Sequence, residues 1–219
     1  FLLFIMCSIN HDKKAIYIHI PKTGGSFIRD SLKNYYGFKP YYLKRPDHNQ
    51  FCRIYDNSVD KHENKIFGTL LYYKTSPHLN RIMNMDQEKW NNYFIFTFVR
   101  NPYDRLISGY SYCNKFNISF DNFINNMMRF NCWIYWHSFM PQIRHITNEK
   151  GENNMNFIGK YENLYEDFNS VLQILNFKII HKNIVKNKSN HKHYSIYYNE
   201  KNLKGINNIL GDDLKELDY

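Results

Sequence analysis

Cysteine, glycine and proline are all scarce in this chain of 219 residues, which contains four, nine and six of them respectively. The cysteines form no CxxC pair, and no spacing of cysteine with histidine suits zinc, which excludes a structural zinc module. A domain of this size does not need covalent cross-links, so the thiols are interpreted either as two disulfides or as four ordinary thiols. These cysteines are Cys7, Cys52, Cys113 and Cys132.

Long hydrophobic runs are missing as well. The apolar stretch FLLFIMC at the start of the chain is far too short to cross a bilayer, which needs about 20 residues. Residues 1–14 are interpreted as an N-terminal extension, either the remnant of a signal anchor in a longer chain or a first strand. Residues 15–219 are interpreted as one domain, because 43% of the chain is hydrophobic and no repeat or flexible linker divides it.

Acidic residues are outnumbered. The chain has 20 Asp and Glu against 29 Lys and Arg, which gives a net charge of +9. Such a surface favours an anionic partner, for example nucleic acid, a nucleotide, an acidic glycan or a membrane surface. A compositional bias towards Lys, Asn, Ile and Tyr explains the charge equally well, so the charge alone does not choose a function.

Strand-like apolar segments alternate with amphipathic helical segments. Strands are predicted at 15–20, 65–73 and 93–99 and at the start of 156–164. Helices are predicted at 26–36, 76–85, 101–113, 120–130 and 165–175 and from about Glu200 onwards. Gly37 stands where a C-terminal glycine cap belongs. The alternation predicts a P-loop-like single α/β domain with a mostly parallel central sheet flanked by helices.

The segment HIPKTGGSF lies where the first predicted strand gives way to a helix. Free N–H groups and the helix dipole favour phosphate or sulfate binding at such a junction. Gly24 and Gly25 let the backbone approach an anion closely, and Lys22 adds a full positive charge. Thr23 or Ser26 can add a hydroxyl group. The alternative is an ordinary glycine turn with an exposed lysine.

This loop is not a Walker A motif, in which the lysine follows the glycines in the pattern GxxxxGK[ST]. Lys22 precedes both glycines here. That order, together with the lack of carboxylates suited to Mg²⁺ after a strand, argues against a nucleotide-dependent kinase.

A second segment, FTFVRNPYDRLISGY, places Arg100 at the exit of a predicted strand and Ser108 in the helix that follows. The planar guanidinium group can meet a phosphate with two bonds, and the serine can donate a hydroxyl bond. Asn101 can cap the helix. The alternatives are a salt bridge from Arg100 to Asp104 and a surface position for Ser108. Arg105 is interpreted as structural, pairing with a nearby carboxylate.

The two segments together resemble the cofactor motifs of sulfotransferases, in the branch of heparan sulfate 2-O-sulfotransferases, other Golgi carbohydrate sulfotransferases and bacterial relatives. EKWNNYFIFTFVRNP and FIGKYENL resemble further segments of the bacterial members. Two C-terminal segments also resemble the bacterial members, namely NKSNHKHYSIYYNEKNL and GDDLKELDY. The resemblance covers roughly residues 15–219.

The resemblance implies transfer of a sulfuryl group from 3′-phosphoadenosine 5′-phosphosulfate to an acceptor hydroxyl or amine, without a metal. The product nucleotide is 3′-phosphoadenosine 5′-phosphate. The first loop would hold the 5′-phosphosulfate, and the second motif the 3′-phosphate. The implied cofactor-binding residues are Lys22, Thr23, Gly24, Gly25, Ser26, Phe27, Arg100 and Ser108. Lys22 is also implied as the catalytic cation on the bridging oxygen.

The reaction also needs a base for the acceptor's proton, and here the sequence departs from its relatives. Those relatives have a glycine-histidine pair and a lysine-histidine pair. In this chain, Thr69 and Thr75 stand at the positions of the two histidines. His78 is the predicted base, with His62 and His137 as alternatives. The next candidates are Glu63 and Glu88, while His19 is expected to have a buried structural role.

The expected acceptor is a glycan, neutral or anionic, and no nucleic-acid partner is expected. The basic loop 181–194 is expected to close over the nucleotide, line an acidic acceptor or remain solvated. Two other functions stay open: a catalytically inactive sulfotransferase-like protein that binds nucleotide or glycan, and a basic nucleic-acid-binding protein. The expected location is the Golgi lumen if a type II anchor was removed, and otherwise the cytoplasm.

Overall fold

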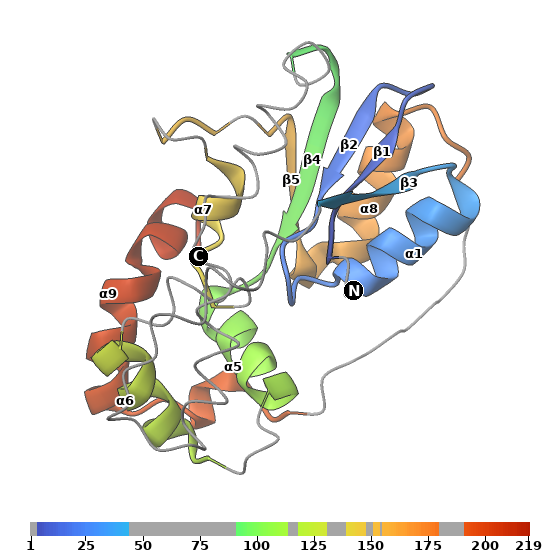
Figure 1. Ribbon diagram of the computed structural model, residues 1–219. Coiled ribbons are helices and arrows are strands. Elements are labelled where there is room, and N and C mark those ends of the chain that lie inside the picture. The colour runs from blue at the N-terminus through green and yellow to red at the C-terminus, as the bar shows by residue number, and fades with distance from the viewer. Residues whose placement is uncertain are drawn as a thin grey trace, which may run out of the picture.

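The computed structural model describes residues 4–43, 91–113, 118–130, 139–147, 151–153, 155–179 and 191–219 (Figure 1). Its strands are β1 (Phe4–Asn10), β2 (Ala15–Ile18), β3 (Lys39–Leu43), β4 (Phe94–Val99) and β5 (Phe157–Lys160). Its helices are α1 (Gly25–Tyr35), α5 (Pro102–Cys113), α6 (Phe120–Phe130), α7 (Ile143–Ile146), α8 (Leu164–Ile174) and α9 (Glu200–Glu216). Two short 3-10 helices are η4 (Tyr161–Asn163) and η5 (Tyr194–Ile196). The predicted strand 65–73 and helix 76–85 lie outside the described residues.

The described strands form one sheet in the order β3-β1-β2-β4-β5. β2, β4 and β5 are parallel, with Ile18 paired to Thr97 and Val99 paired to Lys160. β1 is antiparallel to both β2 and β3. The prediction of parallel strands is therefore confirmed for β2, β4 and β5, while β1 makes the sheet mixed. Residues 4–10 are a strand of this sheet, which is one of the two interpretations of the N-terminal segment.

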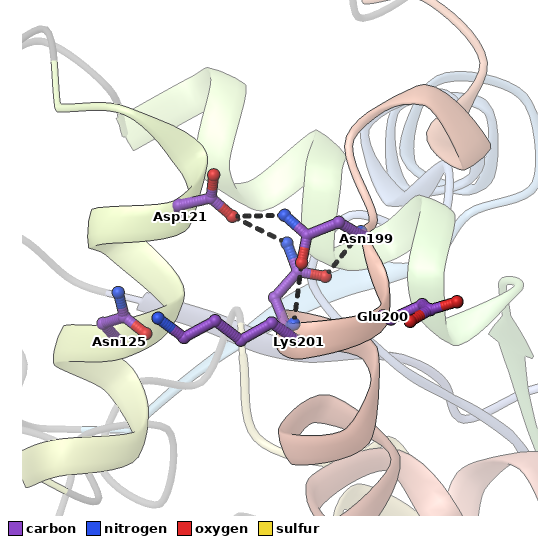
Figure 2. Close-up of a pocket in the computed structure, with 6 residues that line it drawn as sticks. Asp121, Asn125, Asn199, Glu200 and Lys201 are labelled. Carbon is purple, nitrogen blue, oxygen red and sulfur yellow. Dashed lines mark hydrogen bonds between the residues drawn. The ribbon is translucent and has the colours of Figure 1, made fainter.

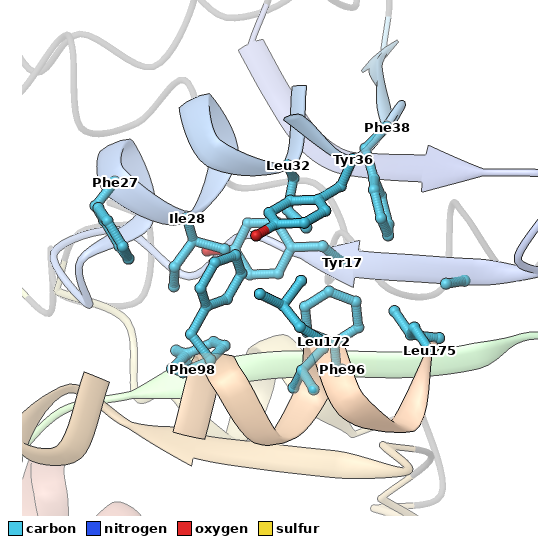
Figure 3. Close-up of a cluster of buried hydrophobic side chains, with 13 residues drawn as sticks. Tyr17, Phe27, Ile28, Leu32, Tyr36, Phe38, Phe96, Phe98, Leu172 and Leu175 are labelled. Atoms are coloured by element: carbon cyan, nitrogen blue, oxygen red, sulfur yellow. The ribbon is translucent and has the colours of Figure 1, made fainter. Parts of the chain in front are cut away.

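The two central parallel strands are buried, as their uninterrupted apolar sequences predict. All four side chains of β2 and five of the six in β4 are buried. Tyr17, Phe96 and Phe98 face α1 and α8, where they pack with Leu32 and Leu172 (Figure 3). This cluster fixes both helices on one face of the sheet.

The opposite face is covered by the other helices. Val99 alternates with Phe98 along β4, so it points to the other side of the sheet, where it packs with Ile146 of α7 and Leu217 beyond α9. A second core joins α5, α6 and α9, which Figure 1 shows grouped apart from α1 and α8. The predicted layering, with helices flanking the sheet, is confirmed.

Both predicted helix boundaries at the two motifs are present. Gly37 has φ of 69° directly after α1, and the N–H of Phe38 donates back to the carbonyl of Leu32 over 3.2 Å. Asn101 Oδ1 accepts two N–H groups from the first turn of α5, at 3.1 and 3.2 Å. The first boundary ends α1 before β3, and the second begins α5 directly after β4.

Cys7 is a free thiol, buried in β1, and burial raises its pKa to about 12. Cys113 is the last residue of α5, and Cys52 and Cys132 lie outside the described residues. No helix within the described ranges is both long and apolar enough to span a membrane.

Candidate active site

Three connections meet at the carboxyl ends of the parallel strands. β2 leads into the loop at residues 19–24, β4 into residues 100–101, and β5 into η4. The strand register places these three exits side by side. Ligands of open α/β sheets bind outside the carboxyl ends of the strands, so this edge is the candidate site.

In the first loop, the residues on either side of Thr23 have left-handed backbone conformations. Lys22 has φ of 71° and Gly24 has φ of 82°. The Thr23 hydroxyl is fully buried and donates to the carbonyl of Ile20 over 2.8 Å. The Thr23 hydroxyl, which was predicted to bind an anion, therefore forms a hydrogen bond within the loop. Lys22 precedes Thr23 in this loop.

The start of α1 depends on both glycines. A Cβ atom at Gly25 would lie 2.0 Å from Cε1 of His19, so only glycine fits against that ring. Tyr17 Oη lies 3.4 Å from Nδ1 of the same ring. At Gly24 the positive φ favours glycine, and a Cβ would meet Leu164 at 3.0 Å. The half-buried His19 therefore packs against the helix start, which agrees with a structural role.

Ser26 and Phe27 occupy the first turn of α1. The N–H of Phe27 already donates to the carbonyl of Gly24, over 3.0 Å, and its buried ring packs against Phe168. The structure thus gives Phe27 the role of an anchor for α1, and its contact with a cofactor stays a prediction.

Arg100 joins the second motif to the first. Its Nη1 donates to the carbonyl of Lys22 over 3.2 Å, across 78 residues of sequence. Its Nε and Nη2 both reach Asp104 Oδ2, at 2.7 and 2.6 Å, which is the salt bridge named as the alternative. The guanidinium group also lies 4.2 Å from the centre of the Tyr161 ring and is only 5% exposed. Since a guanidinium has five N–H groups, these three bonds leave two for a ligand.

Arg105 supports the same loop from beneath. Its Nε donates to the carbonyl of Pro21 and its Nη1 to the carbonyl of Met140, both over 2.9 Å. Burial lowers its pKa to about 10, while the charge of Asp213 acts in the opposite direction. The structural interpretation of Arg105 agrees with these contacts, although its hydrogen-bond acceptors are backbone carbonyls and the carboxylate acts through its charge.

Ser108 is buried one helical turn beyond Asp104, on the same face of α5. Tyr112 follows one turn later, and Lys22 Nζ lies 4.2 Å from the centre of its ring. One face of α5 therefore runs from the Arg100 pair, past Ser108, to the ammonium group of Lys22. Of the predicted phosphate-binding residues, Lys22, Arg100 and Ser108 therefore lie along this face.

Two supporting residues, Glu162 and Gln142, were not predicted. Glu162 Oε1 accepts the N–H of Asn101 over 2.7 Å, and its Oε2 accepts the hydroxyl of Tyr219 over 2.9 Å. Gln142 holds the backbone of Arg100 with two bonds of 2.9 and 2.8 Å. Glu162 could have been found as an acid directly after a predicted strand, whereas nothing in the sequence marks Gln142.

The predicted bases are not tested by the structure. His78, His62 and His137 lie outside the described residues, as do Glu63 and Glu88. Among the residues that are described, no group of three or more His, Cys, Asp or Glu side chains could hold a metal ion.

A polar pocket of about 460 Å³ lies elsewhere, between α6 and the start of α9 (Figure 2). Asp121 accepts the side-chain amides of Asn199 and Asn202, at 3.0 and 2.9 Å. The two asparagines also form a capping box at the start of α9. Lys201 extends towards Asn125 at its rim (Figure 2). These bonds explain the polar lining as a helix cap, and none of the residues at the strand exits lines this pocket.

Cationic side chains at the carboxyl ends of parallel strands are typical of α/β proteins that bind anionic ligands. A model of the sulfotransferase family matches residues 6–215. The chain therefore belongs to the sulfotransferase family and is a transferase, and this membership supports sulfuryl transfer in general.

A curated protein of Archaeoglobus fulgidus, described only as an uncharacterized protein, is 34% identical to this chain over 85 residues. The match covers 38% of this chain and 68% of that protein. No solved structure matches the chain.

Proposed function

We propose that this protein transfers a sulfuryl group from 3′-phosphoadenosine 5′-phosphosulfate to a glycan hydroxyl. The observation that carries the proposal is the hydrogen bond from Arg100 to the carbonyl of Lys22, which places the two motifs of the resemblance at one edge of the sheet. Each motif supplies a cation there, as a nucleotide with phosphate groups at two positions requires.

Lys22 and the start of α1 form a P-loop-like site for the 5′-phosphosulfate. The N–H groups of Gly25 and Ser26 in the first helical turn serve an anion at this position, while that of Phe27 bonds to Gly24, and the helix dipole adds to the attraction. Arg100 and Ser108 hold the 3′-phosphate through the two remaining guanidinium N–H groups and the serine hydroxyl.

The reaction breaks the bond between sulfur and the bridging oxygen of the phosphosulfate and forms a bond between sulfur and the acceptor oxygen. Lys22 stabilises the negative charge that builds on the bridging oxygen, because its ammonium group is already placed in the loop. The acceptor's proton passes to a base, for which we keep His78, with His62 and His137 as the alternatives. The net charge of +9 favours an acceptor that is itself anionic.

The donor is tested by thermal unfolding with 3′-phosphoadenosine 5′-phosphate and, in parallel, adenosine 5′-phosphate. At a hundred times the dissociation constant, the first ligand should add about 2.7 kcal/mol and raise the melting temperature by roughly 5–10 °C. Adenosine 5′-phosphate should raise the melting temperature far less. The substitution Ser108→Ala should reduce the difference between the two nucleotides in this rise. Equal responses to the two nucleotides would remove the role assigned to Arg100 and Ser108.

The acceptor is tested by supplying labelled donor with oligosaccharides of graded charge and measuring the label that is transferred. Transfer to an oligosaccharide supports the proposal. Tight nucleotide binding without transfer to any acceptor would instead support an inactive sulfotransferase-like binding protein.

A further inference from the structure

His191 lies beside the Arg100–Asp104 pair, at the start of the last described segment. Its side chain is 7% exposed, and its Nε2 is 4.0 Å from Asp104 Oδ1. This nitrogen is buried and has no hydrogen-bond partner among the residues that the structure describes. An unpaired buried polar atom destabilises the folded protein, so its position calls for an explanation.

The other ring nitrogen settles the tautomer. Nδ1 lies 2.8 Å from the carbonyl oxygen of Lys192, which can only accept, so we assign the proton of the neutral ring to Nδ1. Nε2 of the neutral ring is then a bare lone pair that faces a carboxylate, and neither can donate. A second proton on the ring turns Nε2 into a donor aimed at Asp104.

The charge balance at the pair shows when that proton is needed. Arg100 gives two N–H groups to Asp104 Oδ2, so the pair carries no net charge. A phosphate monoester brings a charge of about −1.5 to −2 at pH 7, and Asp104 repels it. Another positive charge beside the carboxylate therefore favours the binding of an anion at this pair.

Among the residues that the structure describes, no other titratable group near the pair has a buried, unpaired nitrogen that faces Asp104. Tyr198 donates its hydroxyl to the carbonyl of Tyr103, and burial raises the pKa of Tyr198, so it stays neutral. Arg105 is already bound to backbone carbonyls. On the same segment as His191, Lys192 and His193 are exposed. Imidazole is the side chain that changes charge near neutral pH.

We propose that binding of the nucleotide's 3′-phosphate is coupled to the uptake of one proton by His191. The imidazolium Nε2–H bonds to Asp104 Oδ1, which neutralises the carboxylate and leaves the charge of Arg100 for the phosphate. The proton comes from solvent. This inference rests on the proposed function, because it requires a nucleotide that carries a phosphate at the 3′ position.

Calorimetric titration of 3′-phosphoadenosine 5′-phosphate at pH 7.5, in two buffers of different ionisation enthalpy, counts the protons taken up. The wild-type protein should take up a measurable fraction of a proton, at most one, per nucleotide. His191→Gln keeps a polar group but cannot titrate, so this uptake should be lost. His11→Gln is the matched control, because His11 bonds to Tyr93 at the opposite end of β4 and its loss should leave the uptake unchanged.

The affinity should show the same coupling. Above neutral pH, the wild-type dissociation constant should rise by up to tenfold per pH unit, since one proton is linked to binding. The rise should be absent in His191→Gln. Adenosine 5′-phosphate should show no proton uptake that depends on His191, because it lacks the 3′-phosphate.

The outcomes separate the two proposals. If wild-type protein does not bind 3′-phosphoadenosine 5′-phosphate, the proposed function fails and the coupling fails with it. If it binds but His191→Gln takes up as many protons as wild type, the coupling alone is overturned. A His191→Gln protein that loses affinity equally at every pH also overturns it, since His191 would then only hold the segment. If His191→Gln does not fold, a wild-type affinity that stays constant from pH 6.5 to 8.5 overturns it.

Discussion

Lys22 holds a backbone conformation that suits glycine better than lysine. Its φ of 71° lies in the left-handed region, which costs a residue with a Cβ atom about 1 kcal/mol or more. Arg100 donates a hydrogen bond to the carbonyl of Lys22. The centre of the Tyr112 ring lies 4.2 Å from the ammonium nitrogen of Lys22. The loop is therefore held from two sides, and its lysine side chain runs along α5 to Tyr112.

Replacing Lys22 by Ala or Gly should distinguish the catalytic role of its ammonium group from the strain of its backbone conformation. Both substitutions should lower sulfuryl transfer by about a hundredfold or more, because each removes the cation from the bridging oxygen. Lys22→Gly should also raise the free energy of unfolding by about 1 kcal/mol relative to Lys22→Ala, because glycine adopts the positive φ freely. Steady-state turnover and urea unfolding check the two effects. Near-normal turnover in either variant would end the assignment of Lys22 as the catalytic cation.

The junction between β2 and α1 is the element that carries the first site. It is packed tightly, because the ring of His19 occupies the space beside Gly25 and the side chains of Leu164 and Tyr161 close on Gly24. The same junction therefore limits side-chain size at both glycines.

Gly25→Ala should destabilise the protein by about 1–3 kcal/mol and weaken nucleotide binding, since the new methyl group must displace the His19 ring. Gly211→Ala is the matched control. A Cβ there meets nothing within 4 Å in α9, so this change should stabilise the protein by about 0.5–1 kcal/mol. Chemical denaturation and nucleotide titration measure both variants. The double variant His19→Ala/Gly25→Ala should recover part of the loss, and no recovery would contradict the steric explanation.

At the scale of the whole molecule, α9 is tied to the site through a buried carboxylate. Asp213 accepts the N–H groups of Gln142 and Ile143 at 2.7 and 2.8 Å, and Gln142 in turn holds the backbone of Arg100. Burial raises the pKa of Asp213, while these hydrogen bonds and the charge of Arg105 act to lower it. A helix near the C-terminus thereby supports the second motif, more than 100 residues earlier in the sequence.

Asp213→Ala should lower the free energy of unfolding by about 3 kcal/mol, because two buried N–H groups lose their acceptor and Arg105 loses a compensating charge. Asp212→Ala changes the exposed carboxylate next to it in α9 and should cost less than about 0.5 kcal/mol. Thermal and urea unfolding of the two variants provide the comparison. Similar stabilities would show that α9 is not tied to the site in this way.

The sequence by itself determined the local parts of this protein. The apolar runs of β2 and β4 predict buried strands, the caps at Gly37 and Asn101 predict where helices end and begin, and both motifs point to one family. These features depend on residues close together in the chain, because hydrophobic periodicity and capping act within a few residues.

The tertiary structure alone decided how those parts are joined. It places β1 antiparallel beside β2, closes Arg100 onto Lys22, and puts His191 against Asp104. It also gives Gln142 and Asp213 a supporting role beside Arg100. Each of these contacts joins residues far apart in sequence, and such pairings depend on sheet order and packing across the whole domain, which the pattern of a single segment does not contain.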